Sequence, residues 1–301
     1  MVLLRDCTKS SSSKATLLGP LDELKTHQTN RGQLNHKDII GLTPRSRVST
    51  HTGAKYLVQQ PTLSTYVLLS PRKCTPIYPK DSSAILELLD VSPGFHVLEA
   101  GTGNGGLTMY LARAVGSSGS LCTVDRNPVA TEHAKKIIGR YDRGRLMPQI
   151  SFHSGSVSEV VRELHMPSED TLGTRGKDNL ICPIYDGVVL DMPTPWDELP
   201  GLYGFVKTDR FVVCYLPNMS QVMELVAKCR RWPLLVEDVV EVTWREWDVR
   251  SAVVRSSQTA DSEGQQAEAM VCRPTHTPTG HTAFLVRLRK CASDAAKTVQ
   301  E

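Results

Sequence analysis

The chain has 301 residues, of which 40% are hydrophobic and 22% charged, which predicts a globular protein of one large domain or one domain with a small companion. The net charge of +3 excludes an overall basic nucleic-acid-binding protein, so nucleic-acid contacts would come from local patches. The eight cysteines contain no C-x-x-C pair, and no apolar run is long enough to span a membrane. We therefore expect a reducing compartment, no structural metal and no membrane span.

The first part of the chain is polar and lacks a clear hydrophobic period. Residues 1–30 are predicted to be a tail, and the serines at 10–13 with nearby basic residues leave two interpretations open: a disordered tail or a mitochondrial transit segment. Short alternating runs punctuated by glycine and proline predict a small β module over residues 31–78. A helix is predicted to start within residues 61–67, with a proline near its first turn.

From residue 95 the sequence alternates between strand-like and helix-like segments, which predicts a mainly parallel sheet covered on both faces. The main domain is predicted at 79–291, beginning with a helix at 82–89, and residues 292–301 are a tail. The polar stretches 166–183 and 256–271 are predicted surface insertions. The last strand is predicted to run antiparallel at an edge. The predicted strands are 95–100, 119–124, 149–153, 185–191, 210–216, 235–246 and 282–289, and the later helices are 106–115, 127–141, 156–164 and 218–231.

A glycine-rich turn organises the main domain. An apolar strand ends in Glu99, the glycines follow, and a helix begins, so backbone N–H groups and a helix N-terminus face a ligand. Gly101, Gly103 and Gly106 fit the dinucleotide pattern G-x-G-x-x-G, which is weak support alone. Glu99 and the glycines at 101, 103 and 105 also fit E-x-G-x-G-x-G, the first motif of class I methyltransferases that use S-adenosylmethionine. An acid here repels a pyrophosphate but suits an ammonium and a sulfonium, so Glu99 favours the methyl donor.

Two further acids end later predicted strands. Asp125 lies where a carboxylate accepts hydrogen bonds from both ribose hydroxyls of NAD or S-adenosylmethionine, so it does not discriminate between them. Asp191 ends an apolar run at the sheet edge where ligands bind in open α/β sheets. Prolines then make the chain rigid, and Trp196 offers a flat surface. Together they indicate recognition of a planar heterocycle; the alternative is that Asp191 is a helix N-cap without a ligand.

Local basic and aromatic stretches complete the list of candidates. Arg72 and Lys80 make the segment before the main domain the best local candidate for phosphate contact, with a solvated loop as the alternative. The run WREWDVR at 244–250, continued by Arg273 and a GHT run, is typical of an interface with RNA or another subunit. His281 in that GHT run is either a general base or, as we favour, a structural histidine.

These stretches closely resemble the tRNA adenine-N1 methyltransferases that modify the T-loop adenosine at position 58. The resemblance runs from about residue 53 to 289 and is closest to the bacterial, archaeal and mitochondrial single-subunit members. Each motif is moderately specific, whereas eight in the correct order are highly specific. They are PTL at 61–63, YPKD at 78–81, VLEAGTGNGGLT at 97–108, LDMPTPW at 190–196, YLPN at 215–218, WREWDVR at 244–250, RP at 273–274 and GHTAFLV at 280–286.

The resemblance implies an α/β fold: a class I S-adenosylmethionine-dependent methyltransferase with a Rossmann-like, mainly parallel seven-stranded sheet and a small N-terminal β module. It implies methyl transfer from S-adenosylmethionine to N1 of adenosine 58 of tRNA, with the base flipped out and no metal required. Asp191 would hold the exocyclic amine and balance charge on the ring, and Tyr78 would lie near the methyl group and base. Thr194 and Asp125 depart from residues common in relatives, and Asp125 keeps a carboxylate for the ribose.

The implied site residues fall into three groups. Asp191 and Tyr78 are catalytic. The cofactor-binding residues are Glu99, Gly101, Thr102, Gly103, Asn104, Gly105, Gly106, Leu107, Asp125, Arg126, Ser156, Val157 and Asp191. The substrate-binding residues are Arg72, Lys80, Trp196, Arg245, Arg250, Arg273 and His281.

Several alternatives stay open. A small-molecule or protein methyltransferase would use the same donor site but has no reason to keep the WREWDVR and GHT runs. Another RNA adenine-N1 methyltransferase, a non-catalytic subunit, or a catalytic subunit active only with a non-catalytic partner are further possibilities; the intact glycine motif with Asp191 favours a catalytic chain. The family's tetramers imply a homotetramer, or a heterotetramer with a related non-catalytic subunit. We expect a mitochondrial location, with the nucleus or cytoplasm as the alternative.

Overall fold

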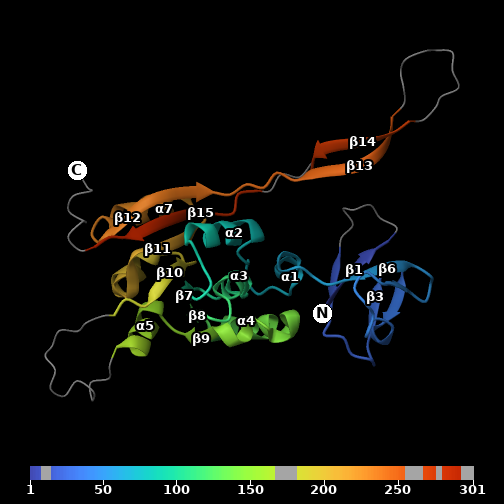
Figure 1. Cartoon of the computed structure of the whole chain (residues 1–301), viewed down its shortest axis with the longest axis horizontal. Helices are drawn as coiled ribbons and strands as arrows, with labels where there is room; N and C mark the ends of the chain where they lie inside the picture. The colour runs from blue at the N-terminus through green and yellow to red at the C-terminus, as the bar shows by residue number, and fades with distance from the viewer. Residues whose placement is uncertain (8–14, 167–181, 255–266, 276–279, 293–301) are drawn as a thin grey trace, which may run out of the picture.

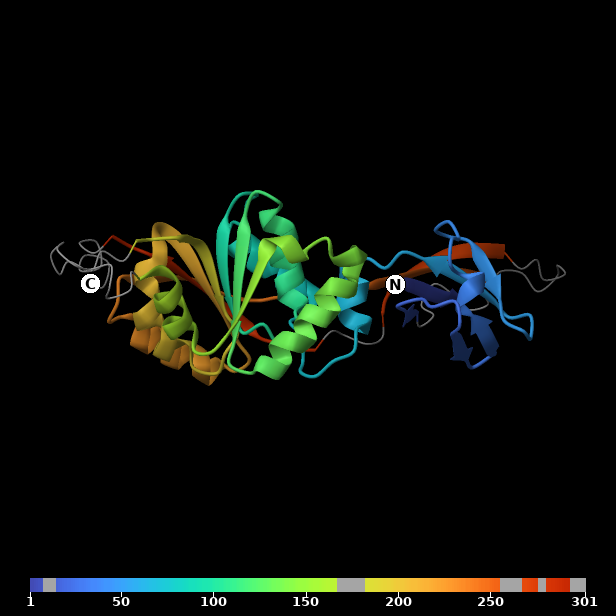
Figure 2. The same ribbon diagram turned by 90° about the horizontal axis from the view of Figure 1, so that it is seen from below.

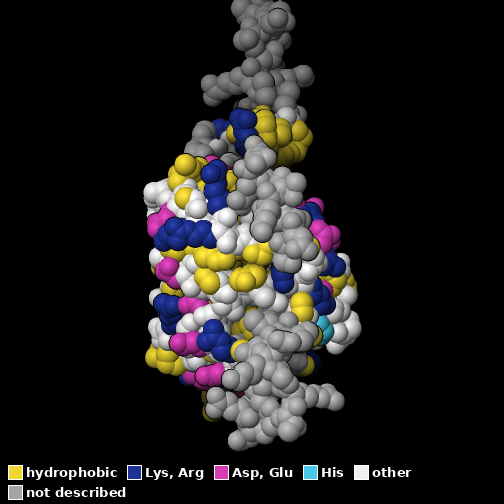
Figure 3. Space-filling model, turned by 90° about the vertical axis from the view of Figure 1, so that its left-hand side faces the viewer, with side chains coloured by type: hydrophobic (Ala, Val, Ile, Leu, Met, Phe, Trp, Pro, Cys, Tyr) yellow, Lys and Arg dark blue, Asp and Glu magenta, His cyan; other side chains and the backbone are white. Residues whose placement is uncertain are grey.

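The computed structural model describes residues 1–7, 15–166, 182–254, 267–275 and 280–292. An N-terminal β module lies at one end of the molecule, and a larger α/β domain forms the rest (Figures 1 and 2). A two-stranded ribbon projects from the large domain toward the end that carries the module. At the opposite end of the large domain, basic and acidic side chains are interspersed around a hydrophobic centre (Figure 3). Among the described residues, no helix is long and apolar enough to cross a membrane.

The N-terminal module begins at the second residue, so the predicted tail at 1–30 is wrong. β1 (Val2–Asp6) pairs with β2 (Thr16–Leu18) and with β6 (Lys55–Gln59), which also pairs with β5 (Arg47–Ser49). A separate hairpin consists of β3 (Thr26–Thr29) and β4 (Gly32–Asn35), and is followed by the 3-10 turn η1 (His36–Asp38). The short apolar run of β1 is buried in this module's own core, which includes Leu4, Leu18 and Leu34. Serines 10–13 lie outside the described residues.

The large domain contains a seven-stranded sheet in the order β12-β15-β11-β10-β7-β8-β9. β15 is the one strand of this sheet that runs opposite to the other six, and it lies between β11 and β12 rather than at the predicted edge. The strands of this sheet are β7 (His96–Ala100), β8 (Ser120–Asp125), β9 (Ile150–Ser154), β10 (Tyr185–Leu190), β11 (Val206–Leu216), β12 (Leu234–Glu241) and β15 (Phe284–Lys290).

Helices cover both faces of this sheet, as predicted. β11 shows why: Phe211, Val213 and Tyr215 contribute to one core cluster, and the residues between them to the other. One face carries α1 (Leu63–Leu69), α2 (Pro79–Leu88), α3 (Gly106–Val115) and α4 (Pro128–Arg140). The other carries α5 (Val157–His165), α6 (Pro195–Leu202) and α7 (Met219–Cys229). Short 3-10 turns are η2 (Tyr141–Gly144), η3 (Met147–Gln149) and η5 (Tyr203–Phe205).

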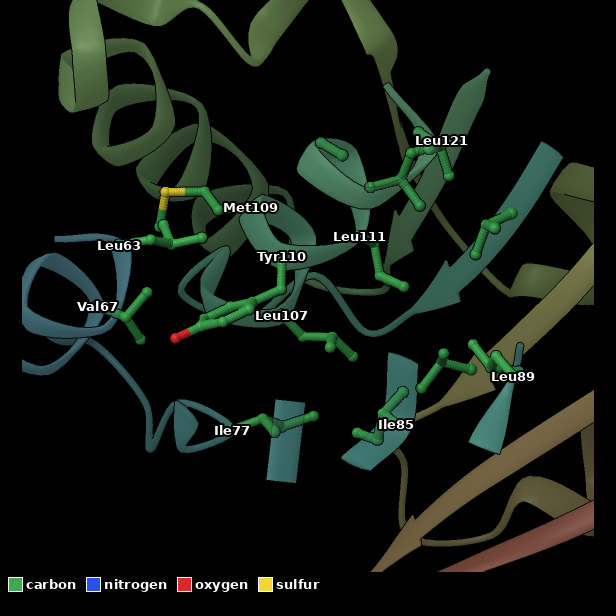
Figure 4. Packing of buried hydrophobic residues seen from close by; sticks show 14 of the residues in the cluster. Leu63, Val67, Ile77, Ile85, Leu89, Leu107, Met109, Tyr110, Leu111 and Leu121 are labelled. Atoms are coloured by element: carbon green, nitrogen blue, oxygen red, sulfur yellow. The ribbon is translucent and has the colours of Figure 1, made fainter. Parts of the chain in front are cut away.

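Helix α1 belongs to the large domain, which corrects the predicted module boundary at residue 78. Leu63 and Val67 of α1 lie beside Tyr110 of α3 in the main core, together with Ile77 from the connection to α2 (Figure 4). The module therefore ends with β6, and α2 begins at Pro79, three residues before the predicted start. Proline fits this position because the first turn of a helix has no acceptor for its N–H.

The ribbon occupies a region where the sequence predicted one long strand and a surface insertion. The strand predicted at 235–246 ends at Glu241, and β13 (Trp247–Val254) then pairs with β14 (Ala267–Pro274). Part of the predicted insertion 256–271 is thus the second strand of the ribbon. The insertion predicted at 166–183 lies mostly outside the described residues, as does the tail at 292–301.

Leu4→Ala should destabilise the N-terminal module by about 2–5 kcal/mol, because it leaves a cavity in a small core. Leu24→Ala, at a leucine that is 95% exposed, should change stability by less than about 0.5 kcal/mol. Chemical denaturation of both variants, followed by limited proteolysis of the module, tests this difference. If both substitutions were silent, the first strand would not be part of the folded module.

Candidate functional site

The candidate site lies where strand β7 has its two parallel neighbours, β8 and β10, on opposite sides. Their carboxyl ends open a crevice at this switch in strand order, the usual ligand position in an open α/β sheet. A cavity of about 210 Å³ occupies the crevice. Its lining residues are Ala100, Gly101, Val124, Asp125, Arg126, Gly155, Val157, Asp191, Met192, Pro193, Thr194 and Glu198.

Of the glycines in the turn, Gly101 opens the cavity. A Cβ on Gly101 would lie 3.2 Å from Oδ2 of Asp125 and would fill the space beside this carboxylate. Gly105 instead serves packing, because it adopts φ +75° and a Cβ there would lie 2.9 Å from Ile138 of α4. The turn thus combines a ligand-facing glycine with one that lets α4 pack closely.

Asp125 is fixed by the backbone on both oxygens. Its Oδ2 accepts a hydrogen bond from the Gly103 N–H at 2.8 Å, and its Oδ1 accepts one from the Asn127 N–H at 2.8 Å. The carboxylate therefore has a defined orientation at the cavity wall, at the end of β8. This placement agrees with the ribose-binding role implied by the sequence, which stays a prediction.

Glu99 lies beneath the turn rather than in the cavity wall. Its side chain faces α3, and its Oε2 accepts hydrogen bonds from the hydroxyls of Thr108 and Thr123, both at 2.7 Å. Burial raises the pKa of this carboxyl to about 8, and the charges of Asp191 and Asp125 act in the same direction. Glu99 therefore braces β7 against α3 and β8, and a direct contact with the donor ammonium stays a prediction.

Asp191 connects β10 to the turn through its backbone. Its N–H donates to the Ala100 carbonyl, and its own carbonyl accepts from the Gly101 N–H at 3.2 Å. Burial raises the pKa of its carboxyl to about 6, with a further contribution from the charge of Asp125. None of the ion pairs found in the described part of the chain involves Glu99, Asp125 or Asp191. Asp125 and Asp191 line the cavity without a basic partner, so the cavity is suited to a cationic ligand.

Glu198 is a site residue that the sequence interpretation missed. It is buried on α6 and lines the cavity. Its carboxylate accepts hydrogen bonds from the hydroxyl of Ser156 and from the backbone N–H of Ser158, both at the start of α5. Its Oε1 also lies 2.5 Å from Nη2 of Arg126. An acid in the first turn of a helix is an ordinary complement to the helix dipole, so the sequence carried no signal of this role.

The predicted cofactor residues divide by position. Gly101, Asp125, Arg126, Val157 and Asp191 line the cavity. The other eight do not contribute to its wall: they are Glu99, Thr102, Gly103, Asn104, Gly105, Gly106, Leu107 and Ser156. These residues shape or fasten the turn and the start of α5.

Tyr215, near the end of β11, is a second residue that the sequence interpretation missed. Burial raises the pKa of its phenol, and the charges of Asp81 and Asp191 and the nearby Tyr78 raise it further, while a hydrogen bond with Thr282 opposes them. Tyr215 thus lies within electrostatic range of both predicted catalytic residues. Tyr78 itself is the N-cap of α2, and the Arg72 guanidinium lies 5.9 Å from the centre of its ring.

Lys80 cannot contact phosphate as predicted, because it is buried and its ammonium is fully used inside the protein. Nζ donates to Oδ1 of Asp81 at 2.7 Å, to the Val242 carbonyl at 2.8 Å and to the hydroxyl of Thr282 at 2.5 Å. The hydrogen bonds to Val242 and Thr282 connect α2 to the segment after β12 and to the GHT run. The sequence alone does not show that Lys80 is buried whereas Arg72 is exposed.

Trp196 is also not a surface for a planar base. Its ring is 5% exposed and packs in the core between the sheet and α5 to α7, with Nζ of Lys228 4.8 Å from its centre. The prolines before it begin α6, so the indole points inward with Leu199. The substrate role predicted for Trp196 is therefore wrong.

His281 has a structural arrangement, as favoured from the sequence. Its Nδ1 lies 2.6 Å from Oε1 of Glu241, and its Nε2 lies 2.9 Å from the Pro217 carbonyl. Both partners are acceptors, so the ring satisfies both only as an imidazolium. The hydrogen bond with Glu241 raises its pKa, followed by the one with Pro217.

The three remaining arginines predicted to bind substrate lie on or beside the ribbon. Arg245 lies 5.4 Å from the ring centre of Trp247, and Arg250 lies 3.9 Å from a carboxylate oxygen of Asp248. Arg273 is on β14, directly opposite Asp248. These guanidinium groups are therefore grouped near the root of the ribbon.

The sheet order and the switch-point cavity define a class I SAM-dependent methyltransferase fold. The SAM-dependent O-methyltransferase from Thermotoga maritima has a TM-score of 0.74, covering 97% of this chain and 92% of that chain at 23% identity. The tRNA (m1A58) methyltransferase TrmI from Aquifex aeolicus has a TM-score of 0.68, covering 97% of both chains at 22% identity. These likenesses support the predicted fold class.

Sequence comparison then establishes the family. Residues 53–270 match the family model described as the tRNA methyltransferase complex GCD14 subunit. The tRNA (adenine(58)-N(1))-methyltransferase TrmI of Thermus thermophilus is 36% identical over 282 residues, covering 94% of this chain and 95% of that protein. The catalytic subunit TRM61 of Candida glabrata is 27% identical over 239 residues, covering 77% and 63%. The chain belongs to this family of tRNA methyltransferases, which confirms the resemblance found in the sequence.

Glu99→Gln should stabilise the ligand-free protein at alkaline pH. The folded-state pKa of about 8 lies above the ordinary value of 4.5, so the wild type loses stability as pH rises between these values, and the glutamine variant does not. At pH 9 the variant should be more stable by at least about 1 kcal/mol, roughly one pKa unit. Denaturation between pH 5 and 9 measures this, with Glu163→Gln at an exposed site as the matched control. A difference independent of pH would refute the buried-charge account.

Proposed function

We propose that this chain is an S-adenosylmethionine-dependent tRNA (adenine(58)-N(1))-methyltransferase. The observation that carries the proposal is Asp191, a buried carboxyl at the rim of a switch-point cavity that Asp125 also lines. The names of the TrmI relatives support the choice of base and position. The WREWDVR and GHT runs, which a small-molecule enzyme does not need, support a large substrate.

The cavity fits the proposed methyl donor. S-adenosylmethionine supplies an electrophilic methyl group on a sulfonium. Its positive charges match the unpaired acids Asp125 and Asp191, with Glu99 beneath them, and the space that a Cβ on Gly101 would fill is available to the ligand. Asp125 would hold the ribose, while Val157 and the neighbouring cavity wall would hold the adenine.

Asp191 has two tasks in the proposed reaction. Adenine N1 has an in-plane lone pair and needs no prior deprotonation, so the protein must mainly orient the base. The Asp191 carboxylate accepts a hydrogen bond from the exocyclic amine, which fixes the base and balances the charge that develops on the ring. Tyr215 lies within electrostatic range of both Asp191 and Tyr78, which supports a position for the two tyrosines beside the base. Because N1 faces the pairing partner in folded RNA, the base is flipped out.

The tRNA surface is proposed to include Arg72, Arg245, Arg250 and Arg273. The last three lie at the root of the ribbon, which extends toward the end of the molecule that carries the N-terminal module (Figure 1). These guanidinium groups are suited to phosphate and to stacking on bases.

The ribbon also supports the proposed assembly, a tetramer of this chain. A two-stranded ribbon is marginally stable in water by itself. One of its faces carries Trp247, Val249 and Met270, which are 54%, 55% and 69% exposed. A second copy of the chain would cover this face. The alternative is a heterotetramer with a related non-catalytic chain, since the TRM61 relatives are named catalytic subunits. The mitochondrial location stays a prediction, with the nucleus or cytoplasm as the alternative.

The purified chain alone should transfer labelled methyl groups from S-adenosylmethionine to unmodified tRNA, with N1-methyladenosine mapped at position 58. Asp191→Asn should lower kcat at least a hundredfold while donor affinity changes less than about tenfold, because the lost interaction forms mainly in the transition state. A wild-type chain that binds the donor but modifies no tRNA would indicate a missing partner chain. Methylation at another base or of another substrate class would overturn the proposal.

Trp247→Glu should weaken the assembly at least tenfold, because it places a charge on the apolar face of the ribbon. Sedimentation equilibrium over a range of protein concentrations measures this change. Arg250→Ala, on the opposite face of the same strand, should keep the assembled mass and weaken tRNA binding with a reduced salt slope. An unchanged mass for Trp247→Glu would exclude this face from the subunit contact.

A further inference from the structure

The segment of residues 71–77, here called the strap, crosses the glycine turn between α1 and α2. The side-chain amide of Asn104 binds the backbone of two adjacent residues of the strap: its Oδ1 accepts from the Lys73 N–H at 2.9 Å, and its Nδ2 donates to the Cys74 carbonyl. Asn104 is 7% exposed. A buried amide with both ends satisfied by one segment is a specific clamp, because an apolar side chain of the same size leaves both peptide groups unpaired.

The strap also packs against glycines of the turn. A Cβ on Gly103 would lie 3.4 Å from Sγ of Cys74, and one on Gly106 would lie 3.4 Å from Pro76. The side chain of Ile77 points into the main core beside Tyr110 (Figure 4). These two glycines, assigned to the cofactor from the sequence, thus leave space for the strap.

We propose that Asn104 is a positioning residue: its amide clamps the strap onto the glycine turn and thereby fixes Tyr78, which directly follows the strap, relative to the donor cavity. The proposal rests on the proposed function and adds a residue that acts through another. Asn104 does not line the cavity, and both polar atoms of its side chain are bound to the strap. The clamp therefore connects the glycine turn to the segment that carries Tyr78 through the two hydrogen bonds of Asn104.

Cys74 provides a probe of the clamp that does not depend on activity. Its thiol lies over Gly103, where partial burial raises its pKa and the charges of Asp125 and Asp191 raise it further. Cys74 is an exposed residue, and a strap that leaves the turn moves its thiol away from both carboxylates, so its pKa falls toward the ordinary value. Its reaction with a maleimide should then accelerate, since the thiolate is the reactive form.

The test compares Asn104→Leu and Asn104→Asp with Asn35→Leu, which removes a side-chain hydrogen bond to Asp38 in the N-terminal module. The full chain is treated with N-ethylmaleimide, and peptide mass spectrometry gives the rate at Cys74 relative to Cys7 of the same molecule, which is also exposed but lies in the N-terminal module. Both Asn104 variants should raise this ratio at least threefold, and Asn35→Leu should leave it unchanged. The aspartate variant keeps one acceptor and is the milder change if the leucine variant does not fold.

Methyl transfer provides the second readout. Both Asn104 variants should lower kcat at least tenfold while KM for tRNA changes less than about threefold, because only Arg72 of the four arginines proposed to contact RNA lies in the strap. An unchanged Cys74 ratio in a folded variant would overturn the clamp. A raised ratio with unchanged kcat would overturn the positioning role. A wild-type chain that neither binds the donor nor modifies tRNA would contradict the proposed function instead, and the Cys74 ratio would still decide whether the clamp exists.

Discussion

The buried carboxyl of Glu99 holds the glycine turn in place, and the rest of the site depends on that turn. Two threonine hydroxyls, from α3 and β8, donate to one of its oxygens, and Thr123 is in turn 2.7 Å from the hydroxyl of Thr102 in the turn itself. These hydrogen bonds offset part of the cost of burying a charged carboxylate. Because the remaining cost of desolvation is larger, the pKa of Glu99 is still raised. Glu99 thus connects β7 to α3, to β8 and, through Thr123, to the turn.

The three acids show how one arrangement serves both stability and binding. Asp125 and Asp191 lie at the cavity, and the charge of each raises the cost of ionising Glu99. Without a positive ligand this repulsion disfavours the fully ionised site, and a cationic ligand relieves it. With a pKa of about 8, Glu99 avoids this repulsion in the ligand-free protein by staying protonated at neutral pH, and the proposed cationic donor would lower that pKa. The absence of arginine or lysine partners, within the described residues, is what makes this possible.

Much of the fold could be predicted because its signals are local. The alternation of apolar strands with amphipathic helices gave the helix at 106–115 to the residue, and the acids at strand ends gave the position of the cavity. The errors concern side chains whose role depends on distant partners. Lys80 was predicted to bind phosphate because the sequence does not show that its ammonium is bound by Thr282, which lies about two hundred residues later in the chain. Trp196 was predicted to stack on a base because the sequence does not show that α6 directs its ring into the core. The first strand was missed because its partner, β6, lies fifty residues away.

The strap changes how the glycine motif should be understood. Of its glycines, Gly101 faces the cavity, Gly105 accommodates α4, and Gly106 accommodates the strap. A pattern usually explained by ligand approach is here largely a requirement for dense packing around the turn. This packing places the segment that precedes Tyr78 directly against the glycine turn. The residue proposed to lie near the base and the turn proposed to border the methyl donor are therefore held by the same contacts. A substitution on the side of the turn that contacts the strap would therefore change the position of Tyr78 more than it changes the cavity proposed for the methyl donor.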